Sequence, residues 1–285
     1  MINSYLLELD GKPAGRFQSL EGGGVATELI PAPFKGTMKI TRPMSFRNIV
    51  MKFGAGMSRE FYRWISDSLK KNYTRLSGSI VRLDALNKEV GRIEFVDGIL
   101  TSLKLSPLKA GSTEDLIFRA EIAIEKYAMS KTPLSKSNLG IYTAASAKPL
   151  NKGNFKVDIA DLDTGSVSAV SDLVYSQIIK EFHNGDDPLS RKMPQGSRYS
   201  NVTITLPKDR GDSFLKWHQK SVIDHSRTMP MEKSGSIELL GTDKKSLFEI
   251  ELHELGIISA SFKGNDMVVE MYCDSFLLTD VGAGM

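Results

Sequence analysis

The sequence predicts a mainly β protein of the α+β class, built from two tandem copies of a small β-barrel or sandwich domain that each carry one flanking α-helix. Three observations predict this fold. Phe61 and Trp64 in FYRW recur as Phe214 and Trp217 in FLKW, 153 residues later. Short runs rich in β-branched residues, separated by turn residues, fill most of each copy. One amphipathic helical pattern interrupts these runs in each copy.

The repeat extends beyond the two aromatic pairs. Three further blocks recur in the same order: FRNIV at 46–50 as YSNVT at 199–203, SGSI at 77–80 as SGSI at 234–237, and YLLEL at 5–9 as FKVDI at 155–159. The offset drifts between 150 and 157 residues, as it does when loops change length. This period exceeds that of solenoid repeats. We therefore expect copy one over residues 1–129, a linker over 130–153 and copy two over 154–285.

The strands of copy one follow an early strand at 5–9 and a long arm that contains glycine and proline. They are predicted at 50–53, 80–86, 90–96, 99–105 and 116–127, with turns at 77–78, 87–88, 97–98 and 110–111. Copy two repeats the pattern, with strands at 237–240, 247–252, 257–262 and 267–278 and turns at 241–243 and 263–265. This order indicates a mainly antiparallel sheet or small barrel.

The helix of each copy carries the repeated aromatic residues. In copy one the apolar residues that fall on one helical face are Met57, Phe61, Trp64, Ile65 and Leu69. Ser58 and Glu60 suit the first turn of this helix. Because their spacing matches an apolar helix face, we interpret Phe61, Trp64, Phe214 and Trp217 as structural core anchors rather than as stacking platforms for nucleic acid.

The composition is that of a globular chain. With 285 residues, of which 41% are hydrophobic, it can bury two cores of about 130 residues each. No apolar run is long enough to span a bilayer and the N-terminus lacks the pattern of a secretory signal, so we expect a soluble protein without membrane contact. The single cysteine, Cys273, excludes an internal disulfide and is expected to be a buried strand thiol.

The net charge of +3 is unevenly distributed. Residues 1–129 carry a net charge of +5, residues 130–153 carry +4, and residues 154–285 carry −6. A basic front and an acidic back would attract the opposite end of a neighbouring molecule, although imbalances of this size also occur on ordinary solvated surfaces. The acidic second copy argues against a nucleic-acid-binding module.

Motifs of catalysis and ligand binding are not found. The sequence contains no dinucleotide fingerprint, P-loop, nucleophile elbow, zincin helix or EF-hand loop. The four histidines are scattered without metal-ligand spacing: His183, His218, His225 and His253. We therefore expect no catalytic residue, no metal, no cofactor and no enzymatic activity.

The order of elements in copy one is specific. The helix MSREFYRWISDSLKKN is followed by the strand SGSIVRLDAL, a strand containing GRIEF, and the closing strand RAEIAIEKYAM. In this order copy one resembles the tail-tube family of contractile phage tails and related contractile injection systems. Copy two resembles it through FLKW, SGSIELLG, FEIEL and VVEMY. Family members usually carry one copy of the domain, whereas this chain carries two.

The resemblance implies a structural subunit of an inner tail tube, located in a virion tail or injection particle and assembled in the host cytoplasm. In the family, hexameric rings stack into a hollow tube, through which DNA or protein cargo would pass without specific binding. Tail sheath and baseplate proteins are the implied partners. Three chains in a pseudo-sixfold ring and six chains in a segment of double height both fit two copies. We expect the arms, residues 11–47 and 160–198, to carry much of the contact between rings.

Two further hypotheses remain open from the sequence. A baseplate hub or tube initiator with paired tube-like domains would also use tandem copies. A tandem β-domain effector or binding module would need a convergent polar site, for which the sequence offers no candidate.

Overall fold

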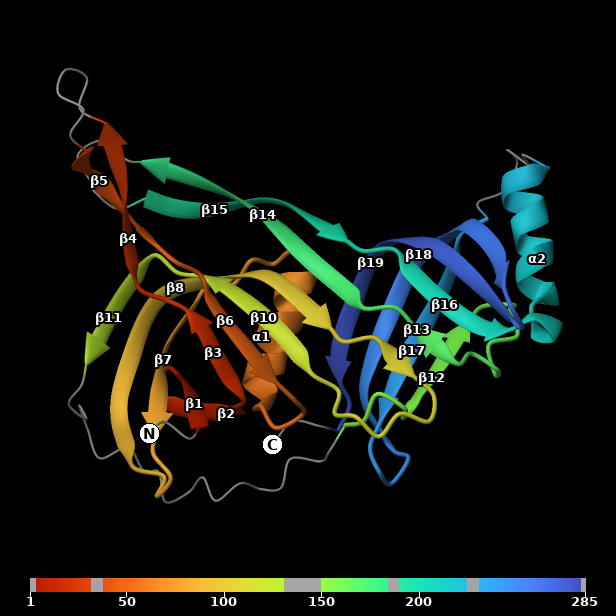
Figure 1. Ribbon diagram of the computed structural model, residues 1–285, viewed down its shortest axis with the longest axis horizontal. Coiled ribbons are helices and arrows are strands. Elements are labelled where there is room, and N and C mark those ends of the chain that lie inside the picture. The colour runs from red at the N-terminus through yellow and green to blue at the C-terminus, as the bar shows by residue number, and fades with distance from the viewer. Residues whose placement is uncertain (1–3, 32–37, 131–149, 184–189, 225–230, 283–285) are drawn as a thin grey trace.

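The computed structural model describes residues 4–31, 38–130, 150–183, 190–224 and 231–282. These residues form a mainly β structure, as predicted, with two large antiparallel sheets along the long axis of the molecule (Figure 1). Helix α1 lies near the middle of the molecule and helix α2 lies at one end (Figure 1). The described residues up to 130 are called the first half, and those from 150 onward the second half.

The first half provides most of a ten-stranded sheet and a separate hairpin. Its elements are β1 (Ser4–Leu9), β2 (Lys12–Phe17), β3 (Ser19–Gly22), β4 (Val25–Pro31), β5 (Met38–Phe46), β6 (Ile49–Phe53), α1 (Arg59–Leu69), β7 (Leu76–Leu83), β8 (Glu89–Leu105), β9 (Leu108–Lys109), β10 (Phe118–Ala123) and β11 (Lys126–Ser130). Strands β4 and β5 pair only with each other among the described residues.

The second half provides most of a seven-stranded sheet. Its elements are β12 (Phe155–Ile159), β13 (Ala169–Val170), β14 (Leu173–His183), β15 (Ser190–Tyr199), β16 (Val202–Pro207), α2 (Asp212–His218), β17 (Lys233–Leu240), β18 (Ser246–Lys263) and β19 (Asp266–Asp280). A short 3-10 turn (Lys208–Arg210) precedes α2, and a π-helical turn (Gln219–Ile223) follows it.

The two halves repeat the same strand order. The path β1-β7-β8-β10-β6-β3 corresponds to β12-β17-β18-β19-β16-β13. The registers correspond as well, because Leu7 lies opposite Ile80 where Val157 lies opposite Ile237. These pairs are related by the offsets of 150 and 157 residues that the sequence gives. Residues at matching places are called equivalent below.

The predicted turn at Asp97 and Gly98 is wrong, because both residues lie inside strand β8. The strand continues through this point, and its partners change from β7 to β10. Asp97 adopts a positive φ of 57°, and a Cβ on Gly98 would come within 3.0 Å of the Leu76 carbonyl oxygen. The two residues therefore form a corner inside one long strand, which local turn chemistry does not distinguish from a loop. Glu254 in β18 repeats the corner with a φ of 52°.

Helix α1 begins where the sequence predicts. The Ser58 side chain caps its first turn by accepting a hydrogen bond from the Phe61 amide at 3.3 Å, and Glu60 lies in that turn. The buried face contains Phe61, Trp64 and Leu69. This helix packs against β19 of the second half. Its Phe61 ring also packs against Phe53 of β6, with ring centroids 5.0 Å apart, so the helix is an element of the contact between the halves.

The two cores that the composition allows are continuous with each other in the structure. Buried apolar residues of both halves form one continuous cluster. Phe248 of β18 inserts between the rings of Tyr62 and Phe118, with ring centroids 4.8 and 5.6 Å away. Its equivalent in the first half is Gly91, so the sequence repeat alone does not reveal this aromatic bridge.

Most of the predicted linker, residues 131–149, lies outside the described residues. Its last residues are part of the packed structure. Leu150 is buried, and its carbonyl accepts a hydrogen bond from the Leu116 amide at 2.8 Å. Asn151 forms a β-bridge with Asp115.

Candidate assembly surfaces

The four aromatic residues singled out by the repeat lie at equivalent places. All four are buried, and none exposes more than 5% of its surface: Phe61, Trp64, Phe214 and Trp217. The indole nitrogen of Trp64 donates to the Thr74 carbonyl at 2.9 Å, and that of Trp217 donates to the Met231 carbonyl at 2.7 Å. Each indole therefore fastens its helix to the segment that leads into the next strand. Their role as stability anchors remains a prediction.

The titratable side chains of the described residues do not converge on a reactive centre. Within the described ranges, no cluster of three or more His, Cys, Asp or Glu side chains could hold a metal ion. The Cys273 thiol is buried, and burial raises its pKa to about 11, which makes it a poor nucleophile. His253 lies beside Glu251, and His225 is outside the described residues. No described helix is long and apolar enough to cross a membrane.

The first surface of interest is an edge that is already covered. Strand β14 of the second half pairs with β8 of the first half and so extends the ten-stranded sheet. Leu173 lies opposite Leu105 and Tyr175 lies opposite Leu103. All four side chains are buried. The two halves are thus joined by backbone pairing over residues 102–105, a joint that a strand edge forms readily.

The base of the β14–β15 hairpin also caps the end of α1. The Tyr175 hydroxyl donates to the Ser68 carbonyl at 3.3 Å, and the Tyr199 hydroxyl donates to the Leu69 carbonyl at 2.8 Å. The last carbonyls of a helix lack intrahelical donors. The Tyr199 hydroxyl supplies a donor to the Leu69 carbonyl, and the Tyr175 hydroxyl adds a second donor to the Ser68 carbonyl, which also accepts from the Lys71 amide at 3.1 Å. Burial raises the pKa of both tyrosines. The joint between the halves therefore depends on neutral tyrosine side chains.

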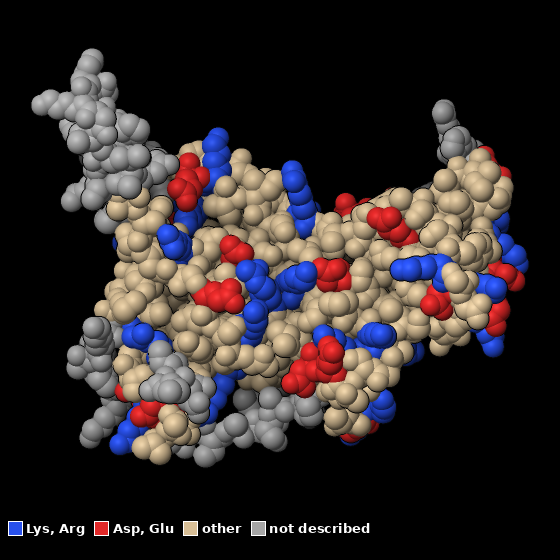
Figure 2. Space-filling model, in the orientation of Figure 1, with Lys and Arg blue, Asp and Glu red and all other residues tan. Residues whose placement is uncertain are grey.

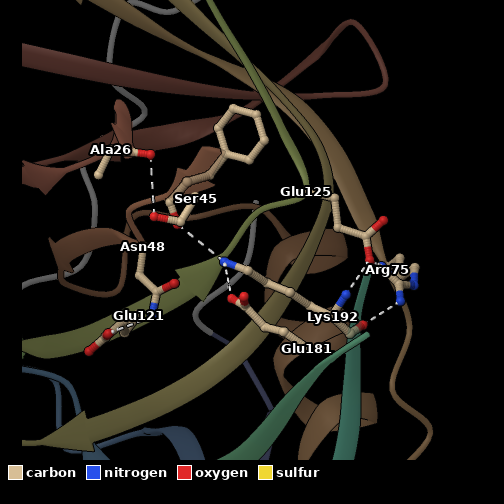
Figure 3. A network of polar contacts seen from close by, with 9 residues as sticks. Ala26, Ser45, Asn48, Arg75, Glu121, Glu125, Glu181 and Lys192 are labelled. Carbon is tan, nitrogen blue, oxygen red and sulfur yellow. Dashed lines mark hydrogen bonds and ion pairs between the residues drawn. The ribbon is translucent and has the colours of Figure 1, made fainter. Parts of the chain in front are cut away.

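Further along the hairpin, Lys192 connects three segments (Figure 3). Its backbone amide donates to Glu125 at 2.9 Å, and its ammonium group donates to the Phe46 carbonyl at 3.2 Å. Arg75 bridges the same carboxylate at 2.5 Å and the Lys192 carbonyl at 2.6 Å. Burial lowers the pKa of Lys192, and Glu181 lies 3.8 Å from its ammonium group. This network, the Lys192 junction, ties β15 to both the first sheet and the end of β5.

In a second contact, called the clasp below, a segment of the first half extends the sheet of the second half. The segment 106–117 between β8 and β10 carries β9, which pairs with β13 of the second half. Lys152 and Glu114 form an ion pair of 2.6 Å across the same contact. The equivalent connection between β18 and β19 is the tight turn at 264–265. This clasp is therefore present in the first half only.

The second surface of interest is the edge of β18 equivalent to the covered one. Residues 259–262 of β18 correspond to residues 102–105 of β8, and they pair with β19 on one side. Among the described residues no strand covers their other side. Ile258 is 40% exposed and Phe262 is 59% exposed. An apolar, unpaired strand edge is a site for pairing with another chain.

The sequence did not predict strands in the two arms. Both arms contain hairpins, β4–β5 and β14–β15, which project toward the same corner of the molecule (Figure 1). The run VYSQIIKEF at 174–182 carries the β-branched and aromatic residues of a strand, and it was the available signal. The base of the second arm joins the halves side by side. Contact of the arms between rings remains a prediction.

Charge on the surface is mixed. On the face shown in Figure 2, Lys and Arg side chains are interspersed with Asp and Glu side chains over both halves. A nucleic-acid-binding surface concentrates basic side chains in a patch or stripe. The visible face does not have that distribution.

The comparisons with known proteins agree with the resemblance stated from the sequence. The family model described as T4-like virus tail tube protein gp19 matches residues 3–128 and 151–267. No curated protein matches the chain.

Three solved structures show a similar fold over one half of the chain. The sheath–tube complex of an extracellular contractile injection system, PVC, in the extended state has 14% identity and a TM-score of 0.40, covering 46% of this chain and 91% of its own. Hcp1 from Flavobacterium johnsoniae has 18% identity and a TM-score of 0.35, covering 45% and 96%. The anti-feeding prophage (AFP) baseplate has 15% identity and a TM-score of 0.37, covering 46% and 93%.

Proposed function

The chain belongs to the T4-like virus tail tube protein gp19 family, and from this premise we propose that it assembles into stacked rings around a central channel. It is a structural protein of the contractile tail tube type, located in a phage tail or an injection particle. The finer proposal is that each chain contributes two copies of the tube domain, residues 1–129 and 154–285, to the wall of the tube. DNA or protein cargo would pass through the channel without a specific site.

One observation carries this proposal. The two halves have the same strand order. They are joined where the β14–β15 hairpin of the second half pairs with the β8 edge of the first half. Among the described residues, the equivalent edge in the second half has no strand on its free side, and the equivalent hairpin in the first half pairs with no third strand. A chain that keeps one edge and one hairpin unused has the two complementary surfaces that head-to-tail assembly needs.

Negative-stain electron microscopy and sedimentation velocity of the purified chain test the proposal. We expect rings or tubes, with a sedimentation coefficient that rises with protein concentration. A strictly monomeric species at every concentration, with no rings on the grid, would exclude it. Sheath and baseplate proteins of the same particle are the proposed partners, and pull-down with assembled tubes measures their binding.

A tube initiator or baseplate hub is the second candidate function. The observation that favours it is the inequality of the halves, because the clasp at 106–117 occurs only in the first half. Unequal halves lower the symmetry of any ring that they form. Electron microscopy distinguishes the two functions, since a wall subunit alone forms long tubes whereas an initiator or hub stops at one or two rings.

A further inference from the structure

The uncovered edge of β18 and the start of β4 are equivalent to the two strands of the joint within the chain. On the premise of the proposed tube function, we propose that Val25 and Ala26 at the start of β4 pair with Ser259 and Ala260 of β18 in a neighbouring chain. The joint that links the two halves within one chain would thus be repeated between chains.

The two hairpins are equivalent. Val25 pairs with Phe46 at the base of β4–β5, and Tyr175 pairs with Tyr199 at the base of β14–β15. The offsets between these pairs, 150 and 153 residues, are also those between the flanking strands β3–β6 and β13–β16. Strand β4 is therefore the counterpart of β14, the strand that pairs with the edge of β8.

The two edges are equivalent in the same way. Leu103 lies opposite Ala120 of β10, and Ala260 lies opposite Val269 of β19. The offset of 157 residues holds along the whole of β8 and β18, including the corner at Asp97 and Glu254. The edge at 102–105 is covered and the edge at 259–262 is not.

Transfer of the register from one joint to the other gives the contacts between chains. Within the chain, Tyr175 lies opposite Leu103 and Leu173 lies opposite Leu105. Between chains, Val25 would lie opposite Ala260 and Ala26 opposite Ser259. The turn at 22–24, where Gly22, Gly23 and Gly24 have φ values of 76°, 70° and 94°, precedes the strand and would lie beside Phe262. Pairing of this kind supplies backbone hydrogen bonds to both edges.

The side chains at the transferred positions are complementary in size. Residues directly opposite each other in an antiparallel pair place their side chains side by side. Where two leucines meet in the covered joint, Phe262 would lie beside the glycine turn at 22–24 and near the Tyr127 ring, which lies 3.4 Å from the place of a Cβ on Gly23. Val25 is 50% exposed and would cover Ala260. Both exposed apolar side chains, Phe262 and Val25, would be removed from water.

Charge supports the same pairing. The β4–β5 hairpin and the residue after it carry Lys39, Arg42 and Arg47, and Lys39 stands at the position equivalent to Lys192. On the uncovered side of the second half, Asp274 is equivalent to Glu125, the carboxylate of the Lys192 junction, and is exposed. Glu232 replaces Arg75 and is also exposed. A basic hairpin would therefore meet an acidic edge.

The proposal has a consequence for the ring. If joints within and between chains alternate, both halves of each chain lie in the same ring, and the number of domains per ring is twice the number of chains. A segment of double height, in which the two halves belong to successive rings, is incompatible with this arrangement.

A cross-linking experiment on the full chain tests the register. Val25→Cys and Ala260→Cys are introduced together in a Cys273→Ser background and oxidised under assembly conditions. We expect disulfide-linked multimers on non-reducing gels. A mixture of the two single variants should give dimers only. The matched control pairs Ala260→Cys with Val90→Cys, an exposed apolar strand position on β8 outside the joint, and should stay unlinked.

A second variant separates this proposal from the proposed function. Ser261→Lys with Phe262→Lys places two charges on the edge at exposed positions, and Val90→Lys is its control. We expect the edge variant to keep its melting temperature within a few degrees, to lose its rings and to sediment as single chains. If the unaltered chain forms no rings, the proposed function fails. If the unaltered chain and the edge variant both form rings and the cysteine pair stays unlinked, only the register proposed here is wrong.

Discussion

The two equivalent strand edges differ in how they are completed. The edge of β8 at 102–105 is covered by β14. The same hairpin donates two tyrosine hydroxyls to the end of α1 and carries the Lys192 junction, and the clasp adds a further contact between the halves. The edge of β18 at 259–262 has the same strand order around it, but among the described residues nothing covers it. The β8 edge is covered within the chain, and the β18 edge is the one that we propose pairs with a neighbouring chain.

The difference lies in the residues of the two hairpins. Tyr175 and Tyr199 are replaced in the first hairpin by Val25 and Phe46, which have no hydroxyl to give to a helix end. The connection after β18 is too short to form a second clasp. The joint within a chain therefore has more polar contacts than a repeated joint between chains would have. Such an order of strength lets each chain fold completely before it pairs with a neighbour.

The largest expected effect is the loss of stability when the tryptophan of either helix is removed. Trp64→Ala and Trp217→Ala should each lower the free energy of unfolding by about 3 to 5 kcal/mol, because each removes a buried aromatic side chain. The loss should be greater for Trp64, since α1 packs against both halves whereas α2 lies at one end of the molecule. Urea denaturation followed by circular dichroism measures both values.

The conservative variants Trp64→Phe and Trp217→Phe serve as controls. They keep most of the apolar volume and lose the indole hydrogen bond to Thr74 or Met231. Each should lose less stability than the corresponding alanine variant. Full retention of stability by either alanine variant would show that the anchor is misassigned in that half.

Much of the fold could be predicted from the sequence. Helix α1 follows from the spacing of Phe61 and Trp64 and from the cap Ser58, because these are local signals. Most core strands follow from runs of β-branched residues. The corner at Asp97 could not be predicted, since a turn and a bend within a strand use the same residues.

The candidate surfaces could be predicted only in part. The repeat indicates which residues are equivalent, but it does not show which equivalent edge is covered. That outcome depends on long-range contacts such as Phe248 against Tyr62 and Tyr199 against the end of α1. Both contacts join residues that are more than a hundred positions apart in the sequence, where no local pattern reaches.

An intermediate effect tests the tyrosines that complete the covered edge. Tyr199→Phe should lower stability by about 0.5 to 1.5 kcal/mol, because the Leu69 carbonyl loses its hydroxyl donor. Tyr175→Phe should cost less, because the Ser68 carbonyl keeps the Lys71 amide as a donor. The reverse change at the equivalent position of the first hairpin, Phe46→Tyr, adds a hydroxyl and removes no hydrogen bond. Chemical denaturation at neutral pH compares the three variants.

The tyrosines also give a pH dependence. Burial raises their pKa in the folded state above the unfolded value of about 10. Their contribution is therefore complete below pH 10 and is lost as the pH rises above that value toward the folded pKa. Between about pH 10 and 12, the stability of the double variant Tyr175→Phe/Tyr199→Phe should fall less steeply than that of the unaltered chain. Equal slopes would contradict the assignment.

The smallest expected effect concerns the rim of the covered edge. Lys104 of β8 and Asp172, just before β14, form an ion pair of 2.5 Å, with side chains that are 45% and 41% exposed. Solvent screens such a pair, so Lys104→Ser should cost at most about 1 kcal/mol. Serine is the residue that β18 carries at the equivalent position, Ser261. The variant thus makes the rim of the covered edge like that of the uncovered one. Because backbone pairing and the tyrosine contacts persist, denaturation should remain a single transition, and a separate melting of the halves would show that the ion pair, rather than the strand, holds them together.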